Sequence, residues 1–228
     1  MVRRASPNFG ERRGGARPDL VVLHYTAMPT AKAALERLCD PDCEVSAHYL
    51  ISRQGVTYQL VEECKRAWHA GAGAWGAVTD VNSRSIGIEL DNTGAQPFPE
   101  PQMAALEALL PEVMGRWAIP PERVIAHSDM APDRKFDPGV RFDWRRLALR
   151  GLSVWPCRGG TGTNALAKRR FHAAADAFGY PAGDLATRLR AFRLRFRPAD
   201  DGPLTLQDVA ALEDLARRFP VDRADHRA

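Results

Sequence analysis

Chargeable side chains are concentrated in one short stretch, VIAHSDMAPDRKFDPG, which occupies residues 124–139. It contains an imidazole at His127, an ammonium group at Lys135 and a carboxylate at Asp137. A second imidazole, His24, lies near the end of a strand-like run, VVLHYT. Two imidazoles and one carboxylate form a three-ligand set for zinc that leaves the fourth coordination position to water. Two other interpretations stay open from the residues alone: a polar, solvated loop, and histidines that are hydrogen-bonded inside the core.

Two more residues could complete a hydrolytic centre. Glu89 lies in the run SIGIEL, on the face opposite the isoleucines, where a buried carboxylate without a partner is costly. Zinc lowers the pKa of a bound water toward about 7 and thereby makes hydroxide available at neutral pH. Glu89 could hold and transfer the proton, and Lys135 could stabilise a developing oxyanion. The spacing of these residues matches no short zinc motif, so the chemistry of the side chains carries the hypothesis.

The elements that would position these residues alternate between strand-like and helix-like runs, which predicts an α/β domain up to about residue 155. His24 and His127 fall at the ends of predicted strands, where α/β proteins tend to place their chemistry. The predicted strands lie in DLVVLHYT, AHYLISRQG, VTYQLV, SIGIEL and RVIAH, and the predicted helices in TAKAALERLC and EPQMAALEALLPEVMGRW.

A glycine-rich stretch, PCRGGTGTN, precedes a purely helical end of the chain. Apolar residues at helical spacing predict helices over 164–178, 184–196 and 205–219, the last with a capping box formed by Thr205 and Asp208. We therefore expect four segments in the chain. They are an N-terminal extension (1–18), an α/β domain with the candidate site (19–155), a linker (156–163) and a small helical domain (164–228).

Composition argues against several other classes of protein. The 228 residues carry a formal net charge of +4, and the arginines are spread along the chain, which does not favour nucleic-acid binding. No apolar run is long enough to cross a bilayer. The N-terminus lacks the apolar segment of a secretory signal, so the expected location is the cytoplasm, or the periplasm if a leader is missing. The sequence predicts no oligomeric state.

Five segments resemble, in order, the zinc-dependent N-acetylmuramoyl-L-alanine amidases of the AmpD/AmiD type: VVLHYT, SAHYLISRQG, WHAG, NSRSIGIEL and AHSDMAPDRKFDPG. The resemblance covers about residues 19–155. It implies a central mixed β-sheet flanked by helices, the fold of T7 lysozyme and the peptidoglycan recognition proteins. It also implies that His24, His127 and Asp137 bind Zn²⁺ and that Glu89 and Lys135 are the catalytic pair.

The same resemblance implies substrate contacts for His69, in WHAG, and for Asn82, just before SRSIGIEL. A surface position for His69 and a turn at Asn82 are the alternatives. The helical end resembles the three-helix peptidoglycan-binding module of the AmiD-like branch, and a purely structural role is the alternative there.

The implied function is hydrolysis of the amide bond between N-acetylmuramic acid and L-alanine, in peptidoglycan or in anhydro-muropeptides. A non-catalytic muropeptide receptor and a zinc peptidase that cuts within the stem peptide are the competing hypotheses. The presence of all five candidate residues favours an enzyme. The sequence does not discriminate between polymeric and soluble substrates.

Overall fold

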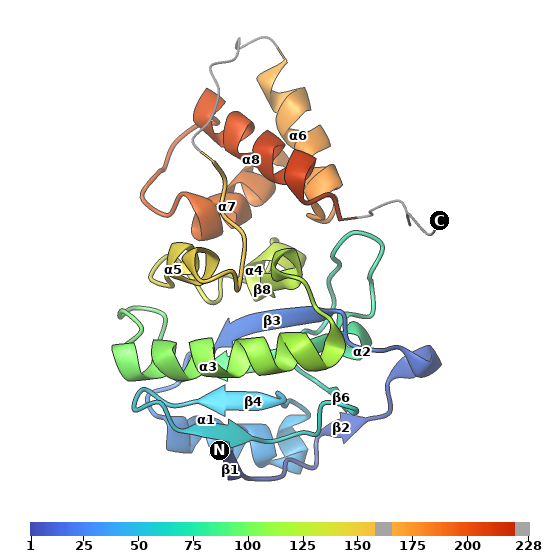
Figure 1. The fold of residues 1–228 in the computed structure, drawn as a ribbon, viewed down its shortest axis with the longest axis vertical. Helices are drawn as coiled ribbons and strands as arrows, with labels where there is room; N and C mark the ends of the chain where they lie inside the picture. The colour runs from blue at the N-terminus through green and yellow to red at the C-terminus, as the bar shows by residue number, and fades with distance from the viewer. Residues whose placement is uncertain (158–165, 222–228) are drawn as a thin grey trace.

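A mixed sheet of six strands lies at the centre of the α/β part in the computed structural model, which describes residues 1–157 and 166–221 (Figure 1). Its strand order is β1-β5-β4-β7-β3-β8, and only the pairing of β4 with β5 is antiparallel among these strands. The strands are β1 (Val2–Arg3), β3 (Leu20–Tyr25), β4 (Tyr49–Ile51), β5 (Thr57–Gln59), β7 (Ser85–Leu90) and β8 (Val124–Ala126). The predicted central mixed sheet is confirmed.

Strands β3 and β7 are buried along most of their length because both faces of the sheet are covered there, as is usual for parallel strands. On one face, Ile86, Ile88 and Leu90 pack under helix α3 (Glu100–Trp117) in a single hydrophobic cluster with Val21 and Leu23. Ile86, Ile88 and Leu90 thus share one face, as their alternation in SIGIEL predicts.

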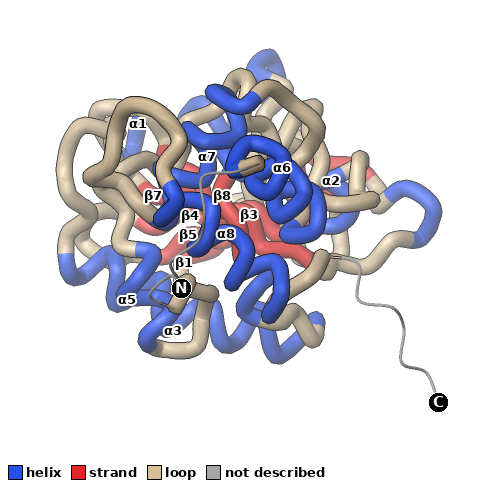
Figure 2. The backbone as a smooth tube through the Cα atoms, turned by 90° about the horizontal axis from the view of Figure 1, so that it is seen from above, coloured by secondary structure: helices blue, strands red, loops and turns tan. Residues whose placement is uncertain are grey.

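The opposite face of the sheet is covered in two places. Helix α1 (Ala31–Cys39) packs its Leu35 and Leu38 against Leu50 of β4. The helical end of the chain covers Leu20 and Val22 of β3, together with Ile125 of β8. Figure 2 shows α6, α7 and α8 above β3 and β8, in agreement with this shared cluster. The candidate site lies on this face, between α1 and the helical end.

The helical end contains α6 (Ala167–Phe178), α7 (Leu185–Phe196) and α8 (Leu206–Arg218), in agreement with the helices predicted from the sequence. Thr205 and Asp208 form the predicted capping box of α8. Most of the predicted linker (156–163) and the first residues of the predicted domain (164–165) lie outside the described residues. The boundary of a separate domain therefore stays a prediction, whereas the shared hydrophobic cluster joins these helices to the sheet.

The first eighteen residues, expected as an extension, contribute β1 to the edge of the sheet and β2 (Phe9–Gly10) to a ribbon with β6 (Arg66–Ala67). Strands of two residues leave no periodic signal in a sequence. The remaining short helical segments are η1 (Arg13–Gly15), η2 (Pro41–Cys43), α2 (Val81–Arg84), η3 (Pro121–Arg123), α4 (His127–Met130) and α5 (Trp144–Leu149).

One buried arginine joins α7 to the sheet. Arg195 is 1% exposed and donates to Oδ2 of Asp129 at 2.6 Å and to the carbonyl oxygen of Val124 at 2.9 Å. Its guanidinium carbon lies 4.4 Å from the ring centroid of Trp144. Asp129 is fully buried, and it also accepts from the backbone of Ala126 at the start of α4. The ion pair therefore fixes the helix that begins with His127.

No helix of residues 1–157 or 166–221 combines the length and the apolar character needed to span a membrane. The cytoplasmic location and the absence of a nucleic-acid partner stay predictions.

Replacement of Arg195 by Met should destabilise the protein, because the buried Asp129 carboxylate would lose its counter-ion. Breaking one side of a buried pair typically costs about 3–5 kcal/mol. Urea unfolding should show this loss in Arg195→Met. Arg217→Met is the control: Arg217 also pairs with an aspartate, Asp214, but its side chain is 73% exposed. Equal, small effects in the two variants would contradict the structural role assigned to Arg195.

Candidate metal centre

Three side chains that are far apart in the sequence converge on one point. Nδ1 of His24 lies 2.9 Å from Nδ1 of His127 and 3.0 Å from Oδ2 of Asp137, and the last two atoms are also 3.0 Å apart. All three residues are buried and form a group that could hold a metal ion. Zinc bonds of about 2.0–2.1 Å in tetrahedral geometry would separate neighbouring ligand atoms by about 3.3 Å, close to this triangle.

The sheet register and one loop bring the ligands together. His24 is the second-last residue of β3, and the neighbouring strand β8 leads directly into His127 at the start of α4. The loop then turns back, and the amide of Ser128 donates to the carbonyl oxygen of Asp137 at 3.0 Å. Gly139, with φ of +78°, provides the left-handed conformation after this ligand that other residues rarely adopt.

The second nitrogen of His127 fixes the state of its first. Nε2 lies 2.9 Å from the carbonyl oxygen of Ala70, which can only accept, so Nε2 carries the proton. Nδ1 of a neutral His127 then has no proton, and its lone pair faces the Asp137 carboxylate oxygen. Two electron-rich atoms at this distance repel each other unless a cation lies between them, so the donor set fits a divalent metal.

The surroundings of His24 and Asp137 favour the forms of these two side chains that can bind a metal. Burial lowers the pKa of His24 to about 4, with the charge of His127 acting in the same direction and Asp137 opposing it. Burial alone would raise the pKa of Asp137, but its contacts with His127 and His24 outweigh burial and hold that pKa below the usual range. Neutral imidazoles and an ionised carboxylate are the species that coordinate metals.

Glu89 lies beside His24 in the pairing of β7 with β3. Its Oε2 atom is buried and has no hydrogen-bond partner among the described residues. Burial raises the pKa of Glu89 to about 8; the charge of Asp137 adds to this effect and that of Lys135 opposes it. A carboxylate with so high a pKa is a strong base when it is ionised.

These residues line one cavity of about 390 Å³, a size typical of small-ligand sites. His24, His127, Asp137, Glu89 and Lys135 all contribute to it. The structure thus brings all five candidate metal and catalytic residues to one site. The cavity extends to α1 and is also lined by Tyr25, Met28, Arg37, Trp68 and Phe136.

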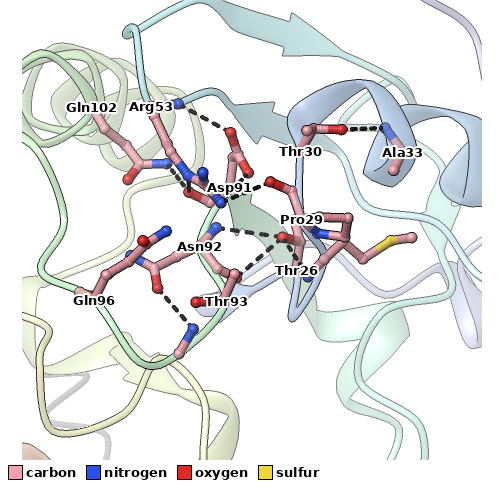
Figure 3. A network of polar contacts seen from close by, with 12 residues as sticks. Thr26, Pro29, Thr30, Ala33, Arg53, Asp91, Asn92, Thr93, Gln96 and Gln102 are labelled. Atoms are coloured by element: carbon pink, nitrogen blue, oxygen red, sulfur yellow. Dashed lines mark hydrogen bonds and ion pairs between the residues drawn. The ribbon is translucent and has the colours of Figure 1, made fainter.

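Loops beyond the ends of β3 and β7 are tied to each other next to this cavity (Figure 3). The carbonyl oxygen of Asn92 accepts from the amide of Ala27 at 3.0 Å and from the hydroxyl of Thr26 at 3.3 Å. Arg53 donates to the carbonyl oxygen of Pro29 at 3.1 Å, which joins the segment after β4 to the same loop. Residues 26–28 of this loop line the cavity, so hydrogen bonds from neighbouring segments hold part of the cavity wall.

His69 and Asn82 are expected to bind substrate; His69 contacts the candidate ligand His24, and Asn82 contacts the backbone of His69. His69 is 9% exposed, and its Nδ1 lies 3.0 Å from Nε2 of His24. Oδ1 of Asn82 accepts from the amides of His69 and Ala70 at 3.1 and 2.9 Å. His69 also lines the cavity. Substrate contact by these two residues stays a prediction.

Sequence reasoning missed Ser85, whose hydroxyl lies 3.1 Å from Nε2 of His69. It also missed the reason for Gly87: a Cβ atom there would lie 2.4 Å from Cγ of His69. The glycine within SIGIEL was the available signal, because a glycine inside a strand often marks the close approach of another group.

Comparison with known proteins agrees with this geometry. Residues 14–140 match the family model for N-acetylmuramoyl-L-alanine amidase. The chain is 42% identical over 156 residues to N-acetylmuramoyl-L-alanine amidase AmiD of Escherichia coli K12, a match that covers 61% of this chain and 55% of AmiD. It is 35% identical over 159 residues to 1,6-anhydro-N-acetylmuramyl-L-alanine amidase AmpD of Enterobacter cloacae, covering 62% of this chain and 85% of AmpD.

A solved structure extends the similarity over the helical end. The complex of AmiD from E. coli with anhydro-N-acetylmuramic acid-L-Ala-D-gamma-Glu-L-Lys superimposes with a TM-score of 0.81 at 31% identity. The superposition covers 94% of this chain and 99% of that chain. From the family match and these relatives, the chain belongs to the N-acetylmuramoyl-L-alanine amidase family.

Proposed function

We propose that this chain is a zinc-dependent N-acetylmuramoyl-L-alanine amidase. The reaction would be hydrolysis of the amide bond between the lactyl group of N-acetylmuramic acid and L-alanine. The observation that carries the proposal is the triangle of His24, His127 and Asp137 ligand atoms beside the unpartnered Oε2 of Glu89. Two imidazoles and a carboxylate suit zinc better than magnesium or calcium, which prefer oxygen ligands.

Held by His24, His127 and Asp137, zinc would supply a Lewis acid that polarises the amide carbonyl and lowers the pKa of water. Glu89 takes the proton from the attacking water at its free Oε2 atom. It then delivers that proton to the nitrogen of L-alanine as the C–N bond breaks. Lys135 stabilises the negative charge that develops on the carbonyl oxygen. The products are a muramoyl carboxylic acid and a stem peptide with a free amino group.

Peptidoglycan-derived muropeptides are the proposed substrate class. One relative is named for its action on a 1,6-anhydro-N-acetylmuramyl-L-alanine bond, and the solved AmiD complex contains an anhydro-muramyl tripeptide. The cavity is large enough for one end of such a molecule and opens between α1 and the loop that carries Asp137. Polymeric peptidoglycan is the alternative substrate of the same chemistry.

Mass spectrometry of the products tests this proposal against its rivals. The protein should convert an anhydro-muramyl tripeptide into anhydro-N-acetylmuramic acid and the intact tripeptide. Shortened peptides would instead identify a peptidase, and binding without cleavage would identify a receptor. Parallel digestion of polymeric peptidoglycan measures the preference between the two substrates.

Replacement of Asp137 by Ala should abolish stoichiometric zinc binding, because two imidazoles alone hold the ion weakly. Elemental analysis of the purified protein after zinc loading measures this. Asp133→Ala is the matched control, since Asp133 belongs to the same loop but is exposed, and this variant should retain one zinc per chain. One zinc per chain in Asp137→Ala would remove Asp137 from the ligand set.

Replacement of Glu89 by Gln should leave zinc binding intact and lower kcat by about 10²–10⁴-fold, the usual contribution of a general base. Gln preserves the shape of the side chain but does not accept the proton. Turnover of the anhydro-muramyl tripeptide and the zinc content are measured on the same sample. Glu36→Gln, at an exposed position of α1, should retain full activity. Normal turnover by Glu89→Gln would exclude Glu89 as the base.

A further inference from the structure

A chain of buried hydrogen bonds runs from His24 away from the cavity. Nε2 of His24 lies 3.0 Å from Nδ1 of His69, and Nε2 of His69 lies 3.1 Å from Oγ of Ser85. The Ser85 hydroxyl in turn donates to the carbonyl oxygen of Val81 at 2.5 Å. His24, His69 and Ser85 are 1%, 9% and 0% exposed, so water has little access to the chain.

The carbonyl oxygen of Val81 determines which atom donates in every hydrogen bond of this chain. A carbonyl oxygen can only accept, so the single hydroxyl proton of Ser85 is committed to Val81. Oγ of Ser85 must then accept from Nε2–H of His69. A neutral imidazole has one protonated nitrogen and one nitrogen with a free lone pair. Nδ1 of His69 is therefore unprotonated and accepts from Nε2–H of His24. This leaves Nδ1 of His24 unprotonated, and Nδ1 is the atom that faces His127 and Asp137.

We propose that His69 and Ser85 are positioning residues that hold His24 in the tautomer able to bind the metal. This inference rests on the proposed function of His24 as a zinc ligand. If His69 carried its proton on Nδ1 instead, it would donate to Nε2 of His24. The proton of His24 would then lie on Nδ1, where it would block coordination. The reversed arrangement would also leave Nε2 of His69 without a donor, because the Ser85 proton is already used.

Asn82 supports both metal-binding histidines through adjacent residues. Its Oδ1 atom accepts from the amides of His69 and Ala70. Ala70 presents its carbonyl oxygen to Nε2–H of His127, and His69 presents Nδ1 to Nε2–H of His24. The Asn82 side chain therefore holds the backbone of His69 and Ala70. These two residues provide the acceptors for Nε2–H of His24 and of His127, respectively. Gly87 leaves the space in which the His69 ring lies.

The proposal predicts specific protonation sites that can be measured without turnover. Nitrogen-15 NMR of the metal-free protein distinguishes protonated from unprotonated ring nitrogens. In the wild type, His69 should carry its proton on Nε2 and so should His24. In Ser85→Ala, His69 should lose this preference and populate the Nδ1–H form. A wild-type His69 protonated on Nδ1 would overturn the proposal.

Zinc affinity, measured by competition with a chromogenic chelator, is the second readout. Loss of a group that orients a metal-binding histidine typically weakens metal binding by about 10–100-fold, and we expect a loss in this range for Ser85→Ala. Ser83→Ala is the matched control: Ser83 is 1% exposed and lies two residues away, but it bonds Asp80 and Arg13. Its zinc affinity should equal that of the wild type.

The design separates failure of this inference from failure of the proposed function. A wild-type protein that binds no zinc refutes the proposed metal site. Zinc binding by the wild type with the same affinity in Ser85→Ala refutes only the positioning role. If Ser85→Ala does not fold, Ser85→Thr keeps a hydroxyl at this position and should retain the His69 tautomer and most of the zinc affinity. Loss of both in a folded Ser85→Thr variant would contradict the proposed role of the hydroxyl.

Discussion

The register of three neighbouring parallel strands determines the geometry of the candidate metal centre. His24, near the end of β3, lies next to Glu89 of β7, and β8 on the other side of β3 leads into His127. Because side chains alternate between the faces of a strand, a shift of one residue in either pairing would move one of these groups to the opposite face. The apolar residues between them fix this register, since Val21, Ile86 and Val124 are fully buried under α3. The packing of apolar residues under α3 on one face of the sheet thus determines the positions of His24, Glu89 and His127 on the opposite face.

The cavity lies on the face of the sheet opposite α3, next to the two groups of elements that cover this face. Helix α1 covers the β4 side and the helical end of the chain covers the β3 and β8 side. The space between them is lined by charged and aromatic residues from both the strands and the loops. Burial raises the pKa of Glu89 and lowers that of His24, so it favours the neutral form of both side chains.

Much of this arrangement could be predicted from the sequence. His24, His127 and Glu89 stand out because chargeable groups at strand ends, or on a buried strand, conflict with an apolar environment, and Asp137 stands out through its place in the charged loop that follows His127. The three C-terminal helices follow from their periodicity. The connection of His69 to Ser85 could not be predicted, because a serine hydroxyl carries no positional signal and the contact depends on how α2 meets β7. The packing of the C-terminal helices on β3 could not be predicted either. Leu20 and Val22 indicate that one face of the strand is buried, but they do not indicate which element covers it.

Arg195 gives the helical end a structural role in the α/β part, in addition to its resemblance to a binding module. Its guanidinium neutralises Asp129, two residues beyond His127, and reaches the strand that leads into this histidine. A gene shortened after residue 157 would therefore remove more than an attached module. The shortened product would expose Leu20, Val22 and Ile125 to water and would leave a negative charge inside the remaining fold. If recombination exchanged the C-terminal helices between amidases, the new helices would need an arginine that can pair with Asp129. Otherwise Asp129 would have to be replaced by an uncharged residue.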